Sequence, residues 1–494
     1  MKNLIICTLG AGLIPFSASQ TDVQAKSKTK TQPRKPNVLF IVVDDLRPEL
    51  NCFGATYMRT PNFDRLAAQG TIFQRAYCQQ AISAATRNSL LTGMRPDGIG
   101  IYDLGTYFRK HLPDVVTLPQ QFMNNGYRVE GVGKVYHTGH GNQEDSLSWH
   151  VKWEPDEVLG KLQSIKRGDT TKLESDFPYI GKKMLPWYAT AIPDSDMKDG
   201  RVVEVAIDRM KALKDEPFFM AVGIVKPHLP FVAPKKYWDL YDKKDIVIPS
   251  KDEPEGMPDV SMVPFGELRK YYGIPAKGLV SDEQAVNLIH GYRACVSFVD
   301  AMLGQLMDAL EKNGIADNTI VVLWGDHGWK LGDYGNWCKH SNMEFDTNAP
   351  LMISAPGLKG GGKSNALVEF VDVYPTICQL AGLPLPSHLQ GTTLIPILHN
   401  PQAKVKDVAI SQYPRGNKNE IMGYSMRTEK YRYTRWVRFN EVGRPTVHAE
   451  LYDQSHGKLV DKNLAMHPEY KNLVEQLDKQ LTAELAKYKA YPRK

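Results

Sequence analysis

Acidic side chains follow two short apolar runs, at the points where the runs end. Asp44 and Asp45 come directly after Asn37–Val43, and Asp326 and His327 follow a second run. Three carboxylates brought together would form a cage of hard oxygen ligands that suits Ca²⁺ or Mg²⁺. Taken alone, an Asp-Asp pair after a strand is as often a capped turn.

Basic and imidazole groups occupy comparable positions after two other apolar runs. Lys134 and His137 follow Tyr127–Val132, and His228 follows Phe218–Val225. Lysine can hold an anion, and histidine can move protons near neutral pH. Each coincidence is weak alone, but the four together favour one composite site that holds a cation and an anion.

The elements that must position these residues alternate along the chain. Continuous apolar runs of this length are typical of strands buried on both faces, and residues 319–323 are a further candidate. Helices are predicted between the strands at Pro61–Ala68, Val202–Leu213 and Asp282–Lys312. The pattern predicts an α/β fold, with a large, mostly parallel or mixed sheet sandwiched by helices. Ligand sites of such sheets lie at the carboxyl ends of the strands.

The pattern changes past about residue 400. Short strands at Tyr424–Arg427 and Arg432–Val437 precede a polar helix predicted near His467–Tyr488. We therefore predict a catalytic domain over residues 36–400 and a smaller α+β subdomain with an antiparallel sheet over residues 401–494.

The N-terminus is typical of a secretory signal. Lys2 precedes an apolar run that continues to Ile14, and the small residues Ser17-Ala18-Ser19 offer a cleavage site. We predict a signal peptide over residues 1–19 and a disordered leader over residues 20–35; a buried N-terminal strand is the alternative. No later segment approaches about 18 uninterrupted apolar residues, so no membrane span is predicted.

Charge and cysteine content exclude two classes of protein. Residues 1–35 contain six basic residues and one acid, so most of the formal net charge of +6 lies there. The remainder is nearly neutral, which argues against nucleic-acid binding, and an anionic substrate would need a local cluster of cations. The five cysteines after the signal segment are scattered and odd in number, so neither a disulfide framework nor a zinc site is predicted.

The segment Ser83–Gly93 resembles the signature of the sulfatase family, which belongs to the alkaline-phosphatase superfamily. There a Cys or Ser is followed by Pro or Ala, then by Arg at the fifth position and by Thr-Gly. The matching residues are Ser83, Ala85, Arg87 and Thr92-Gly93. Alone, such a short match would more often mark a helix N-terminus. With the clusters after the strands, the resemblance extends from about Pro36 to about Leu464.

The resemblance implies that Ser83 is oxidised to formylglycine (3-oxoalanine), which is present as its hydrate. An ordinary serine that took up sulfate would be left with a stable ester, whereas a geminal diol can expel sulfate by collapsing to the aldehyde. Serine at this position resembles the substrate of serine-type anaerobic sulfatase-maturing enzymes. A periplasmic protein of an anaerobic bacterium is therefore expected.

The resemblance also implies a role for each remaining site residue. One calcium ion is expected at Asp44, Asp45, Ser83, Asp326 and His327. Arg87 matches a residue that would steady the diol, and Lys134 and Lys339 match cations that would neutralise the charge of the sulfate group. His137 matches a group that would assist collapse of the diol. His228 matches the acid that would protonate the leaving alcohol.

Longer strings in both predicted domains resemble the iduronate-2-sulfatase branch. They are Lys226–Phe231, Asp326–Gly332, Trp337–Asn342, Gly423–Thr428 and Glu450–Asp453. This likeness implies a sulfated oligosaccharide substrate, with exo-acting removal of a 2-O-sulfate from a uronic acid of glycosaminoglycan type. The uronate carboxylate would need further cations, for which His228, Lys330 and Arg427 are candidates. Trp329 could form a sugar-stacking wall, and is equally a candidate core residue.

Two other functions stay open. A phosphodiesterase or phosphatase of the same superfamily would need two metal ions and a second ligand set, typically including Asp-x-x-x-His. None of the 13 histidines has an aspartate four residues before it. The other possibility is an inactive, sulfatase-like binding protein, if Ser83 is never matured.

Overall fold

The computed structural model describes residues 34–154, 179–262 and 266–488. The predicted signal peptide, and all but the last two residues of the predicted leader, lie outside these ranges. Among the described residues, no helix combines the length and apolar character that crossing a membrane requires.

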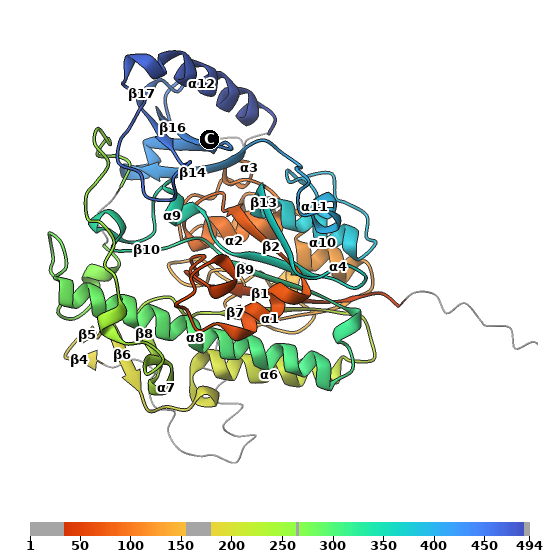
Figure 1. Cartoon of the computed structure of the whole chain (residues 1–494). Coiled ribbons are helices and arrows are strands. Elements are labelled where there is room, and N and C mark those ends of the chain that lie inside the picture. Colours follow the sequence, from red (N-terminus) through yellow and green to blue (C-terminus); the bar gives the residue numbers. More distant parts are fainter. Residues whose placement is uncertain (1–33, 155–178, 263–265, 489–494) are drawn as a thin grey trace, which may run out of the picture. The chain divides into compact units, whose positions relative to one another are not determined.

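A seven-stranded sheet forms the centre of the fold (Figure 1). Its strands, in spatial order, are β13 (Gly362–Glu369), β2 (Thr71–Tyr77), β12 (Leu351–Ser354), β9 (Thr319–Gly325), β1 (Asn37–Val43), β7 (Phe218–Ile224) and β3 (Arg128–Gly133). The four strands from β9 to β3 are mutually parallel, whereas β12 runs antiparallel to both of its neighbours. The predicted mixed sheet is confirmed, and the parallel part is the part that carries the candidate site.

Helices cover both faces of this sheet, which explains the continuous apolar run of β1. Its residues Leu39, Ile41 and Val43 pack into one core cluster, and the alternate residues pack into the other. The first core includes residues of α1 (Pro61–Gln69), α6 (Lys198–Ala212) and α8 (Asp282–Lys312). The second includes residues of α2 (Ser83–Thr92), α4 (Leu118–Asn124) and α10 (Val373–Leu380). A strand buried in this way has no polar face.

A four-stranded antiparallel sheet follows, as predicted. Its strands are β14 (Ala409–Arg415), β15 (Ile421–Arg427), β16 (Tyr431–Arg438) and β17 (Thr446–Asp453). Helix α12 (Lys471–Ala486) buries Leu477 and Leu481 against it. The domain boundary after residue 400 stays a prediction, because Lys35–Lys494 forms one compact unit.

Shorter elements connect these layers. They are α3 (Pro96–Ile99), β4 (Tyr179–Ile180), β5 (Lys183–Met184), β6 (Trp187–Thr190), β8 (Phe231–Pro234), α7 (Lys235–Trp238), β10 (Lys330–Leu331), β11 (Trp337–Cys338), α9 (Glu344–Thr347) and α11 (Ile395–His399). The five cysteines in the described ranges are all free.

Candidate active site

The predicted site residues after the strands converge at the carboxyl ends of the parallel strands. Val43 of β1 lies beside Gly325 of β9, so the two polar pairs that follow these residues emerge together. The backbone N–H of Asp45 donates to Oδ1 of Asp326 at 3.0 Å. The prediction that these carboxylates lie close together is confirmed.

The turn at Asp44-Asp45 is fixed from helix α8. Asp45 has a φ of 58°, in the left-handed region that aspartate tolerates better than most residues. The Tyr292 hydroxyl donates to the carbonyl of Asp45 at 2.9 Å and accepts from the N–H of Arg47 at 2.9 Å. A buried tyrosine therefore holds both sides of this turn.

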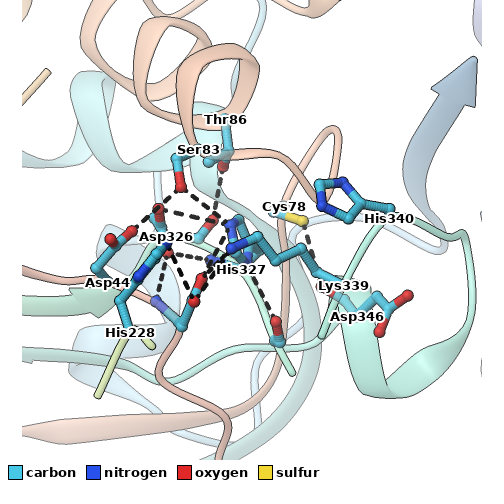
Figure 2. A network of polar contacts seen from close by, with 12 residues as sticks. Asp44, Cys78, Ser83, Thr86, His228, Asp326, His327, Lys339, His340 and Asp346 are labelled. Atoms are coloured by element: carbon cyan, nitrogen blue, oxygen red, sulfur yellow. Dashed lines mark hydrogen bonds and ion pairs between the residues drawn. The ribbon is translucent and has the colours of Figure 1, made fainter. Parts of the chain in front are cut away.

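A set of oxygen ligands and one imidazole surrounds a common point (Figure 2). Nδ1 of His327 lies 3.0 Å from the carbonyl oxygen of Gly328. Nδ1 therefore carries the ring proton, and Nε2 has a free lone pair for a metal ion. Nε2 lies 3.6 Å from carboxylate oxygens of both Asp45 and Asp326. Ligand atoms of these three residues lie within 4.8 Å of one another. This donor set fits one hard divalent cation.

The charges on the two adjacent aspartates also fit a cation. Burial alone raises the pKa of Asp44, but Lys134 and Arg87 hold it well below its ordinary value. Burial raises the pKa of Asp45 in spite of Lys339, and the neighbouring Asp44 carboxylate adds to the rise. The carboxylate of Asp45 is thus incompletely compensated by the protein, and a bound cation would favour its charged form.

Ser83 begins helix α2 and points into this cluster (Figure 2). Its Oγ donates to Oδ1 of Asp44 at 3.1 Å and lies 3.2 Å from Nε2 of His327. The next turn of the helix is tied to the same loop, because the Thr86 hydroxyl donates to the carbonyl of Asp326 at 2.8 Å. Residue 83 is therefore held against the candidate metal ligands at a helix N-terminus, which favours negative charge.

Arg87 lies one turn after Ser83 and is fully buried. Its guanidinium donates to Asp44 and to Asp326, each at 3.0 Å. It also donates to the carbonyl oxygens of Lys134 and Val135. Arg87 thus binds the carboxylates of Asp44 and Asp326 and fixes their positions. Its role toward the diol stays a prediction.

Two lysines approach the aspartates from different elements. Lys134 follows β3 and pairs with Asp44, and its backbone passes so close to Gly223 of β7 that a Cβ at Gly223 would lie 2.1 Å from the Lys134 carbonyl carbon. Lys339 follows β11 and reaches the two carboxylate oxygens of Asp45 at 3.0 and 3.1 Å. Its ammonium lies 4.8 Å from the centre of the Trp329 ring.

His228 is held by the loop that follows β7. The carboxylate of Asp199 in α6 accepts from the N–H groups of Val225 and Lys226, each at 2.8 Å. The Lys226 ammonium donates to the carbonyl of His228 at 3.0 Å. Nε2 of His228 lies 3.8 Å from Asp45. The loop therefore directs this ring into the site.

His137 is also buried beside the cluster. Burial lowers its pKa to about 3, and the charge of Lys134 contributes, so the ring is neutral under ordinary conditions. Its Nε2 lies 3.4 Å from Nδ1 of His140. A neutral imidazole can accept a proton, but the predicted contact with residue 83 stays a prediction.

Glu267 is an ionisable residue of the site that sequence reasoning did not identify. Its two carboxylate oxygens lie 3.0 Å from Nε2 of His228 and 3.0 Å from Nζ of Lys339, and one lies 3.8 Å from Nε2 of His340. Glu267 stands in the polar segment Gly266–Lys270, where no spacing pattern distinguishes it from an ordinary surface acid. Only the folded chain reveals its partners.

Three residues suggested as substrate contacts are instead buried in the structure. Trp329 is 0% exposed and belongs to the core, so the sugar-stacking interpretation was wrong. Lys330 is 1% exposed and pairs with Asp346. Arg427 is 5% exposed and pairs with Glu344 at 3.3 Å. Neither cation is available for a uronate carboxylate, because each neutralises a buried acid.

Removal of the Lys330 side chain should therefore affect folding rather than substrate binding. Lys330→Ala would leave Asp346 as a buried carboxylate without its cation, and we expect the free energy of unfolding to fall by about 3–5 kcal/mol. Denaturant unfolding measures this loss. The double variant Lys330→Met, Asp346→Leu should recover part of it, because both charges are then removed. A large rise in KM at unchanged stability would instead restore Lys330 as a substrate contact.

Comparisons with known proteins agree with this geometry. The Sulfatase family model matches residues 36–383, and a model described as N-sulphoglucosamine sulphohydrolase, C-terminal, matches residues 332–487. The chain is 33% identical to Iduronate 2-sulfatase of Homo sapiens, covering 90% of this chain and 93% of that protein. It is 31% identical to a Sulfatase of Formosa agariphila, covering 97% and 91%.

The fold is also similar to that of solved structures. A phosphonate monoester hydrolase from Silicibacter pomeroyi superimposes with a TM-score of 0.76 at 20% identity, covering 92% of this chain and 96% of that one. At that identity the likeness shows the fold alone.

Proposed function

Because the chain belongs to the sulfatase family and is a sulfuric ester hydrolase, we propose that it removes a 2-O-sulfate from a uronic acid at the end of a glycosaminoglycan-type oligosaccharide. The observation that carries the proposal is the position of Ser83. Its hydroxyl lies between Asp44 and His327, in a cluster flanked by Lys134 and Lys339. A nucleophile beside paired cations suits an anionic ester.

Residue 83 acts as formylglycine, made by a serine-type maturing enzyme, and one calcium ion would be held beside it. The ion would be held by Asp44, Asp45, Asp326, His327 and residue 83. When bound, it supplies positive charge that acidifies the attacking hydroxyl and binds a sulfate oxygen. The preference for calcium rests on the donor set, which is mainly carboxylate oxygen.

Four side chains around residue 83 have separate roles in the proposed reaction. Lys134 and Lys339 stabilise the negative charge of the sulfate group as the bond to the sugar breaks. His228 gives a proton to the leaving sugar oxygen. His137, which is neutral, takes a proton from the second hydroxyl of residue 83 when the aldehyde re-forms and sulfate leaves.

The substrate assignment rests on relatives and on the groups left exposed. The mouse and human relatives that match about nine-tenths of the chain are named Iduronate 2-sulfatase. With Lys330 and Arg427 committed to buried acids, the uronate carboxylate has to be met by groups close to the sulfate site. His228 is assigned to the leaving oxygen, so the candidate is His340, which retains about a quarter of its side-chain exposure.

The protein acts in the periplasm of an anaerobic bacterium, by this proposal. The support is the signal-like N-terminus, which lies outside the described residues, and the serine at position 83. Exo-acting cleavage is supported by the C-terminal sheet, which packs against the loop that carries Lys339. There Nδ1 of His340 lies 2.6 Å from the Tyr413 hydroxyl of β14.

A panel of defined oligosaccharides tests the substrate assignment. We expect sulfate release from a terminal uronate 2-position to exceed release from the hexosamine 4- or 6-position by about 100-fold in kcat/KM, because a misplaced ester loses alignment with residue 83. Sulfate released into solution is the readout. Release from a hexosamine position only would exclude the uronate assignment and leave the sulfatase assignment intact.

A further inference from the structure

Glu267 is an acid outside the proposed set of metal ligands, and it lies beside three basic side chains, those of His228, Lys339 and His340. It precedes a short 3₁₀ helix at Leu268–Lys270, and Leu268 anchors this segment in the core at 1% exposure. The carboxylate itself retains 20% side-chain exposure, so it borders the site and is not sealed within the core. A negative charge here repels a sulfate ester, and its presence therefore calls for a function.

The two oxygens of Glu267 have separate partners. Oε1 lies 3.0 Å from Nε2 of His228, and Oε2 lies 3.0 Å from Nζ of Lys339. Burial on its own raises the pKa of Glu267, but Lys339 and His228 hold it well below its ordinary value, so the bridge is ionic. One carboxylate thus joins a side chain that follows β7 to a side chain that follows β11.

This bridge restricts the two side chains on which the proposed chemistry depends. The other ring nitrogen of His228, Nδ1, lies 2.7 Å from the carbonyl of Leu229, so the ring is held at both nitrogens. Lys339 is held between Asp45 on one side and Glu267 on the other. A lysine side chain otherwise has considerable rotamer freedom, which would have to be lost when substrate binds. Figure 2 shows His228 and Lys339 reaching into the same polar network.

We propose that Glu267 is a positioning residue that acts through His228 and Lys339: it holds the Nε2–H of His228 in the site until the leaving oxygen accepts that proton, and it orients the Lys339 cation toward the sulfate. The inference rests on the proposed sulfatase reaction. It differs from a role in sugar recognition, in which Glu267 would accept a hydrogen bond from a substrate hydroxyl. The contacts favour positioning, because both carboxylate oxygens already have partners in the protein.

The proposal predicts a specific dependence on the leaving group. A proton donor matters most when the leaving oxygen is strongly basic and little when it is a weak base. In Glu267→Gln, kcat should fall about 100-fold for an aryl sulfate with a basic leaving phenol, and about 10-fold or less for one with a strongly acidic phenol. Aryl sulfates carry no sugar hydroxyls, so this series isolates positioning from recognition.

Two further variants complete the experiment on the matured, full-length enzyme. Glu267→Asp keeps the charge and should recover part of the lost kcat. In the double variant Glu267→Gln, His228→Ala, kcat should depend on the basicity of the leaving phenol no more steeply than in His228→Ala alone. The reason is that the effects of substituting residues that act as a unit are not additive. Glu255→Gln is the matched control, because Glu255 lies on the same connecting segment with 78% side-chain exposure and should leave kcat unchanged.

The possible outcomes separate the claims. A loss that grows with the basicity of the leaving phenol, with recovery in Glu267→Asp, supports positioning. A loss confined to sulfated oligosaccharides, or one that is flat across the aryl series, overturns it. A matured wild-type enzyme that hydrolyses no sulfate ester would overturn the proposed function itself, and the inference with it.

Discussion

Protein made in a host without a serine-type maturing enzyme should hydrolyse sulfate esters at least about 1,000-fold more slowly than matured protein, a loss expected when a nucleophile is disabled. The Ser83 hydroxyl already lies 3.1 Å from Asp44 and 3.2 Å from His327, so position alone is not what the unmodified chain lacks. It lacks the second hydroxyl that lets sulfate depart. Steady-state assays of the two preparations measure the difference.

Controls separate maturation from folding. Both preparations should unfold at the same temperature, because the change at residue 83 is confined to one small side chain. Ser83→Ala should be equally inert with and without the maturing enzyme. Equal activity of the unmatured and matured wild-type proteins would contradict the formylglycine assignment.

Removal of the metal should lower activity about as much as failure to mature residue 83 does. A calcium chelator, or Asp45→Ala, should reduce kcat/KM by about 1,000-fold or more, since a metal ion contributes several kcal/mol of transition-state stabilisation. Ca²⁺ should restore the chelated wild type better than Zn²⁺, because the site offers mainly carboxylate oxygens. Activity assays and metal analysis of each variant supply the measurements.

Asp372→Ala is a matched control for Asp45→Ala. Asp372 is also fully buried and also pairs with a lysine, Lys406, at 2.7 Å, but the hydrogen-bond and ion-pair partners of its carboxylate are Glu369, Thr392 and Lys406, which are not residues of the site. This variant should lose stability while the folded fraction retains its metal and its kcat. If Zn²⁺ alone restores activity to the chelated enzyme and phosphate esters are then cleaved, the two-metal phosphodiesterase becomes the better interpretation.

The parallel part of the fold could be predicted from sequence because burial on both faces leaves a clear pattern. The strands at Asn37–Val43 and Phe218–Ile224 are continuous apolar runs, and each was predicted within one residue. Helix Asp282–Lys312 was predicted with its observed bounds, and the structure shows that Ser281 caps its first turn. Strand β12 was missed, since four residues after a proline carry little periodic signal.

The candidate site could be predicted where residues follow strands of known direction. Asp44 and Asp326 lie together because β1 and β9 are parallel neighbours. The alternating pattern indicated parallel strands, but it did not indicate which strands are adjacent. Lys330 and Arg427 were misjudged because sequence does not show that Asp346 and Glu344 lie opposite them. Glu267 was missed for the same reason, since its partners are distant along the chain.

Peptide mass spectrometry across residue 83 tests the central claim most directly. The peptide should be isolated from enzyme that is active on a sulfate ester. Formylglycine differs from serine by the loss of two hydrogen atoms, and its aldehyde reacts with hydrazides. We predict that the peptide containing Ala84 and Arg87 carries this loss at residue 83, in proportion to the specific activity of the preparation. Full activity in protein whose residue 83 is entirely serine would contradict the account.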